Sequence, residues 1–362
     1  MKAAVLTEQP GDLIIEDLVI DKPGPQEVLI NVKGAGLCHS DLHFMEGLFK
    51  AKVPAVLGHE SAGVVEAVGS DVTYVKPGDH VITSPSIFCG ECRKCLGGKP
   101  HLCANVRPTM RARDAAPRLA RHDGTKIDQL ARLGGFAEQM LIHQNGVVKI
   151  TEDIPLDKAC LIGCGVTTGL GAVVRTAGVE PGSSTCVIGA GGIGLSAVQG
   201  ARISGANQII VVDVNDNKLE VAKQFGATHV INASEVDNVV SAVRELSGGG
   251  VDYSFEAIGL KETSEQAFGM LDSGGTATII GMVPSNTKIE IRGMELLTEK
   301  KLQGSVMGSN QFRTDIPRMI QMYLDGRLLL DEMVSATIDL EDINKGYEWM
   351  KAGSATRTVV AF

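Results

Sequence analysis

The 362-residue chain lacks three features, and each absence excludes a class of protein. No apolar run approaches the length of a membrane span, and no charged-then-apolar signal segment opens the sequence. No basic stretch is dense enough to hold nucleic acid, and 34 Lys and Arg against 43 Asp and Glu leave a net charge of −9. We therefore expect a cytoplasmic protein that binds neither a membrane nor nucleic acid.

The eight cysteines are not needed as disulfides, because a chain of this length can bury a full hydrophobic core without covalent links. The absence of a secretory signal favours a reducing compartment, in which thiols bind metals. Two of the eight, Cys160 and Cys186, match no motif, and we expect them to be core residues.

Four cysteines gather in one short stretch with the spacing Cys-x2-Cys-x2-Cys-x7-Cys. They are Cys89, Cys92, Cys95 and Cys103. Four thiolates in a tetrahedral arrangement suit Zn²⁺ and leave no open position, so the pattern predicts a structural zinc lobe at residues 89–103. An iron–sulfur cluster is the alternative. Its bacterial signature continues with x3-Cys-Pro, whereas here Ala104 follows the last cysteine.

The middle of the chain carries a glycine-rich turn between a predicted strand and a predicted helix. A β-branched run at residues 186–188 enters Gly189-x-Gly191-x-x-Gly194, and a helical stretch follows over residues 195–204. Such glycines permit a tight turn and let backbone N–H groups approach a pyrophosphate at the helix N-terminus. About twenty residues further on, Asp213 ends a second apolar run.

Asp213 is placed to accept hydrogen bonds from the adenosine ribose, so the pattern predicts NAD as the coenzyme. The 2′-phosphate of NADP would be repelled there, and neither Val214 nor Asn215 offers the positive charge that NADP requires. The alternative is a glycine-rich turn that binds nothing, with Asp213 a solvated strand end.

Strands and helices alternate after residue 185, which predicts parallel crossover units and a doubly wound α/β sheet. Predicted helices cover residues 219–225, 236–246 and 260–271, and predicted strands cover 208–212, 229–231, 251–257 and 276–283. Residues 1–150 instead show short strands broken by Pro and Gly, the pattern of a β-rich, barrel-like domain. The strongly basic residues 107–132 are expected to form an exposed arm.

Three further residues could form a second metal site. Cys38, His59 and Cys164 together offer two thiolates and one imidazole, the three-ligand set of a catalytic zinc with an open fourth position. Each one alone has a plainer interpretation, because a lone cysteine is usually a small core residue and a lone histidine is usually held by hydrogen bonds.

Over essentially its whole length the sequence resembles the zinc-dependent medium-chain alcohol dehydrogenases in their liver-type form. The match includes Gly58-His59-Glu60, the four-cysteine lobe, Gly163-Cys164-Gly165, the glycine turn and the ending Arg357-Thr-Val-Val-Ala-Phe362. The resemblance implies a Rossmann domain at residues 166–306. It also implies a β-rich GroES-like catalytic domain, formed by residues 1–165 and completed by a return segment at 307–362.

The resemblance also assigns roles to residues near the catalytic zinc. Cys38, His59 and Cys164 become its ligands, Asp41 orients His59, and Glu60 lies near the metal and assists ligand exchange. Ser40 accepts the proton of the alcohol and hands it through the coenzyme ribose to His43. The implied coenzyme contacts are His39, Thr168, Gly189, Gly191, Gly192, Ile193, Gly194, Asp213, Lys218 and Arg357.

The sequence therefore predicts an enzyme with two Zn²⁺ ions per subunit that uses NAD to interconvert a primary or secondary alcohol and its carbonyl. The main alternative is a thiol-adduct formaldehyde dehydrogenase. In that enzyme Arg107, Arg111, Arg113 and Arg118 would hold an acidic thiol cofactor, although a solvated basic face is the plainer interpretation of these arginines. A non-catalytic NAD-binding protein is a remote alternative, because all seven zinc ligands are present. The liver-type resemblance also implies a homodimer that pairs through residues 301–307.

Overall fold

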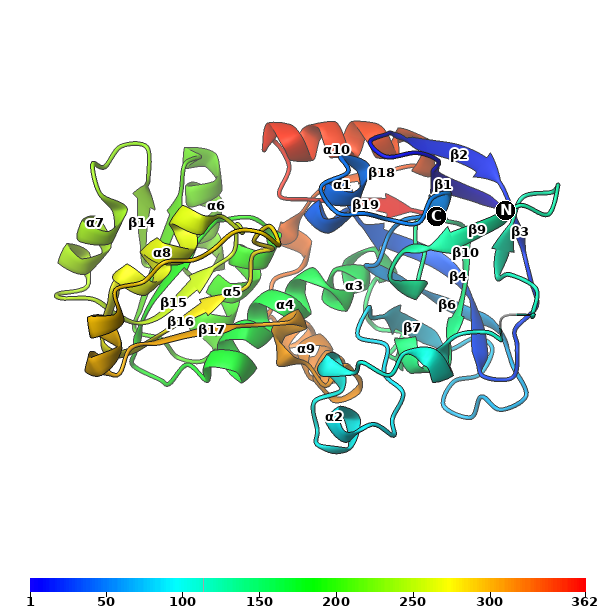
Figure 1. The fold of residues 1–362 in the computed structure, drawn as a ribbon, viewed down its shortest axis with the longest axis horizontal. Helices are drawn as coiled ribbons and strands as arrows, with labels where there is room; N and C mark the ends of the chain where they lie inside the picture. Colours follow the sequence, from blue (N-terminus) through cyan, green and yellow to red (C-terminus); the bar gives the residue numbers. More distant parts are fainter. Residues whose placement is uncertain (113) are drawn as a thin grey trace. The chain divides into compact units, whose positions relative to one another are not determined.

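The computed structural model describes residues 1–112 and 114–362, and the chain divides into two compact units. Met1–Cys164 and Gln311–Phe362 form the first unit, and Gly165–Asn310 form the second (Figure 1). The second unit therefore extends to Asn310, beyond the predicted end at residue 306. The physical reason is close packing, because a Cβ on Gly308 would lie only 2.2 Å from the carbonyl oxygen of Thr167 in the same unit.

The first unit is built on two sheets. One has the strand order β2-β1-β5-β9-β8-β3, and the other has the order β11-β7-β6-β4-β19-β18 with β10 paired to β4. The strands are β1 Lys2–Leu6, β2 Leu13–Asp17, β3 Val19–Ile20, β4 Glu27–Gly36, β5 Ala55–Val56, β6 Ser61–Val68, β7 His80–Thr83, β8 Leu119–Ala120, β9 Lys126–Gln129, β10 Gln139–His143, β11 Val147–Lys149, β18 Val334–Ile338 and β19 Arg357–Ala361.

The helices of the first unit are short where they precede the return segment and longer within it. They are α1 His39–Met45, α2 Arg93–Leu96, α3 Leu156–Ala159, α9 Phe312–Leu324 and α10 Ile343–Ala352. The core gathers apolar side chains from both ends of the chain, for example Val5, Ile30, Phe136 and Tyr347. Burial of this apolar surface is what holds the return segment to the N-terminal part.

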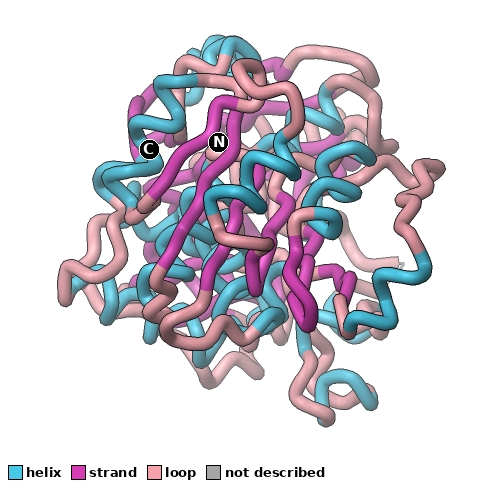
Figure 2. The backbone as a smooth tube through the Cα atoms, turned by 90° about the vertical axis from the view of Figure 1, so that its left-hand side faces the viewer, coloured by secondary structure: helices cyan, strands magenta, loops and turns pink. Residues whose placement is uncertain are grey.

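The second unit is a parallel sheet of six strands in the order β14-β13-β12-β15-β16-β17. In Figure 2 these strands run side by side. The strands are β12 Ser184–Ile188, β13 Gln208–Asp213, β14 His229–Asn232, β15 Val251–Glu256, β16 Leu271–Ile279 and β17 Lys301–Gly304. The helices are α4 Gly165–Gly171, α5 Gly192–Ile203, α6 Asp216–Phe225, α7 Val239–Leu246 and α8 Lys261–Gly269.

The strand order reverses beside β12, as in a doubly wound sheet. From β12 the chain moves outward through β13 to β14, then returns to the other side of β12 for β15 and β16. Helices α5 and α6 touch one another. Because crossovers between parallel strands are right-handed, these two helices lie on the face of the sheet opposite α7 and α8. The predicted α/β alternation is confirmed, although β16 begins at Leu271, within the stretch predicted as helix.

Cys160 and Cys186 are both fully buried, as expected of core residues. Among the described residues no single helix has the length and apolar character needed to cross a membrane. Only the consecutive stretches Leu156–Gly163 and Gly165–Ala177, taken together as a bent pair, meet that test.

Candidate functional site

Four potential metal ligands meet inside the first unit. Cys38 precedes the first turn of α1, His59 and Glu60 stand directly before β6, and Cys164 ends the N-terminal part of the unit. One ligand atom from each of the four lies within 4.8 Å of the others, and all four side chains are buried. A set of two sulfurs, one imidazole and a carboxylate at this spacing fits Zn²⁺.

Asp41 contacts the ring of His59 at Nδ1. Its two carboxylate oxygens lie 3.2 and 3.1 Å from His59 Nδ1, which leaves the other ring nitrogen for the metal. Asp41 also accepts a hydrogen bond from the backbone N–H of Gly58 at 3.0 Å. Gly58 has a φ of +88°, and a Cβ there would lie 2.7 Å from the backbone nitrogen of Phe136. Glycine is therefore needed to bring His59 to the site.

Charges in the site favour metal binding. Burial by itself would lower the pKa of His59, but Asp41 and the thiols of Cys164 and Cys38 outweigh burial and raise it well above the usual value. A hydrogen bond from Cys164, followed by the charge of His59, holds the pKa of Cys38 well below its usual value. The same hydrogen bond raises the pKa of Cys164 well above its usual value. The negative field around the buried imidazole would attract a divalent cation, and metal binding would displace the protons of His59 and Cys164.

Glu60 is joined to the last strand of the chain. Its Oε2 accepts a hydrogen bond from Arg357 Nη2, and both side chains are buried. Strand β4 lies between β6 and β19 and so brings the two residues together. It ends in Gly36, whose missing side chain leaves space for the pair, because a Cβ there would lie 2.6 Å from Glu60 Oε2. Burial raises the pKa of Glu60 to about 8 against the opposing charge of Arg357. The predicted contact of Arg357 with the pyrophosphate stays a prediction.

The predicted relay residues lie along α1. Ser40 and His43 are three positions apart and so share a face of the helix. His43 is half-buried, and its Nδ1 has no hydrogen-bond partner among the described residues. His39 is exposed, with its ring centroid 6.4 Å from that of His43.

The four-cysteine lobe has the geometry of a zinc site. Tetrahedral Zn–S bonds of about 2.3 Å place sulfurs about 3.8 Å apart, and the observed Sγ–Sγ distances are 3.5 Å for Cys92–Cys95, 3.9 Å for Cys89–Cys95 and 3.9 Å for Cys92–Cys103. Helix α2 within the lobe has no buried residue. Because the lobe has so little core of its own, the metal is what would hold it folded.

The two zinc sites are expected to differ in lability. A chelator should remove the ion held by Cys38, His59 and Cys164 first, because only that site has an open position, and activity should disappear before unfolding begins. Elemental analysis during dialysis against the chelator, combined with circular dichroism, tests this. Simultaneous loss of both ions, or a metal content of one zinc or of iron, would contradict it.

The glycine turn in the second unit is shaped for close approach of a ligand to the backbone. Gly189 has a φ of +98°, and a Cβ on Gly194 would lie 1.7 Å from the carbonyl oxygen of Gly189. Helix α5 begins at Gly192 with no side chain capping its N-terminus. Its first N–H groups and the positive end of the helix dipole can therefore bind a pyrophosphate.

Asp213 ends β13 and organises this turn. Its Oδ2 accepts a hydrogen bond from the N–H of Ala190 at 2.7 Å, and its Oδ1 accepts from Val214 and Asn215 at 2.8 and 3.0 Å. The carboxylate therefore supports the glycine turn, and its contact with the ribose stays a prediction. Sequence reasoning did not find this second role.

The remaining predicted coenzyme contacts in the second unit lie on its helices. Ile193 is in the first turn of α5, Thr168 is buried in α4 with its hydroxyl 3.5 Å from Met307 Sδ, and Lys218 is in α6 with its N–H bound to the capping side chain of Asn215. Their contacts with the coenzyme stay predictions.

Asp213→Gly combined with Val214→Arg is expected to move the coenzyme preference toward NADP, because it removes a repelling charge and supplies a phosphate partner. Efficiency with NAD should also fall, since the glycine turn loses its acceptor at Ala190. Steady-state kinetics with both coenzymes test this. Unchanged efficiency with NAD would show that Asp213 is not the ribose ligand.

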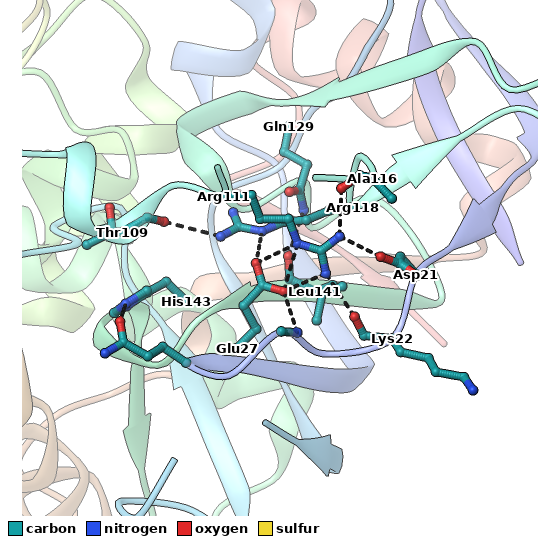
Figure 3. Close-up of polar contacts among 12 residues, drawn as sticks. Asp21, Lys22, Glu27, Thr109, Arg111, Ala116, Arg118, Gln129, Leu141 and His143 are labelled. Carbon is teal, nitrogen blue, oxygen red and sulfur yellow. Dashed lines mark hydrogen bonds and ion pairs between the residues drawn. The ribbon is translucent and has the colours of Figure 1, made fainter. Parts of the chain in front are cut away.

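The basic segment 107–132 is only in part the expected exposed arm: residues 114–116 and 122–126 are exposed, but Arg111 and Arg118 are not. Figure 3 shows Arg111 and Arg118 meeting on the carboxylate of Glu27. The closest nitrogen–oxygen distances are 2.6 and 2.7 Å, and Arg111 also pairs with Asp21 at 2.6 Å. The side chains of Glu27, Arg118 and Arg111 are only 5%, 11% and 16% exposed.

These ion pairs explain why Arg111 and Arg118 are not solvated as expected. Basic residues were expected in solvent, but β4 begins with an acidic residue that the segment folds back to neutralise. The predicted contacts of Arg111 and Arg118 with an acidic thiol are therefore not available in this structure. Arg107 is exposed, and Arg113 lies outside the described residues.

Comparisons with known proteins find matches for both units of the chain. Residues 24–152 match the alcohol dehydrogenase GroES-like domain, and residues 192–324 match the zinc-binding dehydrogenase family. An S-(hydroxymethyl)glutathione dehydrogenase of Paracoccus denitrificans is 40% identical, covering 100% of this chain and 99% of that protein. An alcohol dehydrogenase class-3 of Pisum sativum is also 40% identical, over 99% and 97% of the two chains.

Solved structures give the same result. An alcohol dehydrogenase zinc-binding domain protein from Burkholderia ambifaria has a TM-score of 0.95 at 37% identity, over 100% of this chain and 98% of that one. Benzyl alcohol dehydrogenase from Acinetobacter calcoaceticus has a TM-score of 0.92 at 33% identity, over 100% and 99%. The fold and the two cysteine-containing sites define a zinc- and NAD-dependent oxidoreductase. The chain belongs to the zinc-dependent medium-chain alcohol dehydrogenase family.

Proposed function

We propose that the protein oxidises an alcohol carbon to a carbonyl with transfer of hydride to NAD and release of one proton. The observation that carries this proposal is the set of Cys38, His59 and Cys164 around one point, with Asp41 holding the histidine. Bound zinc supplies a Lewis acid that lowers the pKa of the alcohol, and NAD accepts the hydride. Cys38 and Cys164 as thiolates and His59 as a neutral imidazole would hold the metal, which would leave one position for the alcohol oxygen.

The proton leaves along α1 in this proposal. Ser40 accepts it from the alcohol, and His43, on the same face of the helix, passes it to solvent. Glu60, which is paired with Arg357, would lie near the metal and would assist ligand exchange there.

His43→Ala should therefore slow turnover more than it weakens substrate binding, by about 10²-fold near pH 7. The loss should shrink at high pH, where hydroxide can take the proton directly. The pH dependence of kcat and KM measures both effects. An unaltered pH–rate profile would mean that His43 is only a structural histidine.

For the substrate, we propose an S-hydroxymethyl adduct of formaldehyde with an acidic thiol. The support is the naming of relatives at 40% identity over nearly the whole chain as S-(hydroxymethyl)glutathione dehydrogenase and alcohol dehydrogenase class-3. Arg111 and Arg118 are engaged with Glu27. Among the described arginines of the predicted group, exposed Arg107 therefore remains available to bind the carboxylates of the thiol.

The decisive assay is NADH formation from formaldehyde with and without added glutathione. We expect activity that depends on the thiol, and Arg107→Ala should raise KM for the adduct while leaving KM for a simple alcohol unchanged. Arg121→Ala is the matched control, because Arg121 lies on the same segment but pairs with Glu16. Oxidation that ignores the thiol would reject this substrate.

A second candidate is a primary or secondary alcohol taken without a thiol. It is supported by the TM-score of 0.92 to a benzyl alcohol dehydrogenase and by Ser40, whose small side chain leaves room for a bulky alcohol. A panel of aliphatic and aromatic alcohols run beside the formaldehyde assay separates the two candidates.

We also propose a homodimer in the cytoplasm. Strand β17 is at the edge of the parallel sheet, and the neighbouring Met294 and Leu297 are 76% and 78% exposed. A two-fold partner would satisfy the unpaired backbone groups of such an edge and cover these side chains. None of the eight cysteines, all of which the structure describes, forms a disulfide, which suits a reducing compartment. Light scattering that gave a stable tetramer of the 38.2 kDa chain at low concentration would overturn the dimer.

A further inference from the structure

One buried carboxylate in the second unit takes no part in the sites described so far. Glu256 is the last residue of β15, and its side chain is fully buried. Strand β15 lies between β12, which leads into the glycine turn, and β16. We propose that Glu256 is a positioning residue for the nicotinamide half of the coenzyme, acting through the two loops that follow β15 and β16.

One oxygen of Glu256 organises the loop after β15. Its Oε1 accepts hydrogen bonds from the N–H groups of Ile258 and Gly259 at 2.9 and 2.7 Å, and from the hydroxyl of Thr263 at 2.8 Å. Thr263 belongs to the first turn of α8, so a single atom joins the loop to the helix. Charge-assisted hydrogen bonds of this kind are stronger than neutral ones, which makes the loop rigid.

The loop after β16 is fixed by the same residue. The main-chain oxygen of Glu256 accepts hydrogen bonds from Ile280 and Gly281 at 2.8 and 3.0 Å. A Cβ on Gly281 would lie 2.1 Å from the nitrogen of Gly259 and 2.6 Å from Glu256 Oε2. The backbones of the two loops are therefore in contact. Oε2 is buried without a hydrogen-bond partner among the described residues. The carboxylate of Glu256 therefore lies against both loops.

Both loops border the coenzyme. A Cβ on Gly189 would lie 2.7 Å from Ile258 Cγ1, so Ile258 covers the start of the glycine turn. Ile258 and Met282 are each 45% exposed, the behaviour of apolar side chains that a ligand would cover. Asp213, the predicted ribose partner, lies on the other side of β12. Because the two halves of a dinucleotide bind on the two sides of the switch point, the loops after β15 and β16 border the nicotinamide half.

The test compares NADH with ADP-ribose, which has the adenosine half and the pyrophosphate but no nicotinamide. Glu256→Gln keeps the size of the side chain but removes its charge, which weakens the hydrogen bonds from Ile258, Gly259 and Thr263, and it puts an amide nitrogen in place of one of the two oxygens. We expect the Kd for NADH, measured by fluorescence, to rise about tenfold or more. The Kd for ADP-ribose, measured by calorimetry, should rise less than about threefold.

Ser264→Ala is the matched control, because the Ser264 hydroxyl donates to the carbonyl of Leu260, the residue before α8, and not to Glu256. It should leave the ratio of the two Kd values unchanged. Equal weakening of both ligands by Glu256→Gln would assign Glu256 to the glycine turn alone, and no change would remove any role in coenzyme binding, so either result overturns the proposal.

Thr263→Val keeps the proposal testable if Glu256→Gln does not fold, because it removes only one of the three donors to Oε1. It should shift the ratio in the same direction by about threefold. A folded Thr263→Val protein with the wild-type ratio would count against the proposal.

Discussion

Cys164→Ser should lower kcat by at least about 10³-fold, because the open zinc site loses one of its two thiolates and with it several kcal/mol of stabilisation of the alkoxide. Serine is a far weaker ligand for zinc than a thiolate. The protein should still fold and should keep one zinc, the ion held by the four-cysteine lobe. Metal analysis, circular dichroism and steady-state kinetics on the purified variant check each part.

Cys160→Ser is the matched control for this variant. Cys160 lies four residues earlier and is also fully buried, but its thiol donates to the carbonyl of Asp157 at 3.2 Å. A serine hydroxyl can make the same bond, so both zinc ions and most of the activity should remain. If the two variants lost activity to the same degree, packing rather than metal binding would explain the effect at Cys164.

Glu27→Gln should lower the free energy of unfolding by about 3 kcal/mol at neutral pH, because it leaves two poorly exposed guanidinium groups without their shared carboxylate. Denaturant unfolding measures the change. Glu16→Gln is the control, because Glu16 pairs with Arg121 on the same basic segment but both side chains are more exposed. That variant should lose at most about 1 kcal/mol.

The loss of stability caused by Glu27→Gln should become smaller as the pH falls. Burial by itself would raise the pKa of Glu27, but hydrogen bonds from Arg111 and the charge of Arg118 outweigh burial and lower it. A carboxyl with a depressed pKa in the folded protein contributes stability above its unfolded pKa, and this stability is lost as the pH falls through the folded value. The difference between wild type and variant should therefore be largest at neutral pH and shrink below about pH 4. A difference that stayed constant down to pH 3 would show that Glu27 acts by shape alone.

The parts that the sequence could predict depend on residues that are close together in the chain. Cys89, Cys92 and Cys95 converge because short turns separate them, and the glycine turn from Gly189 to Gly194 is a local conformation. Hydrophobic alternation likewise predicted the parallel sheet, because each strand and helix has its own period.

The missed contacts join residues that only the tertiary fold brings together. Glu60 and Arg357 are 297 positions apart and meet because β6, β4 and β19 are neighbours. Glu27 and Arg111 are 84 positions apart, and the basic composition of residues 107–132 suggested a solvated surface instead. The support that Asp213 gives to Ala190 was missed for a similar reason, since the register between β12 and β13 decides it.

The pairing of Glu60 with Arg357 has a consequence for the order in which the protein can form during synthesis. Domains generally fold as units, the N-terminal one first, as the chain leaves the ribosome. Here the second unit is continuous in sequence and can fold once residue 310 has emerged. The first unit must wait for β19, the last strand to be made, before Glu60 gains its cation and β4 gains the last of its paired strands. A nascent chain stalled before residue 357 is therefore expected to hold a finished Rossmann fold and an immature catalytic domain.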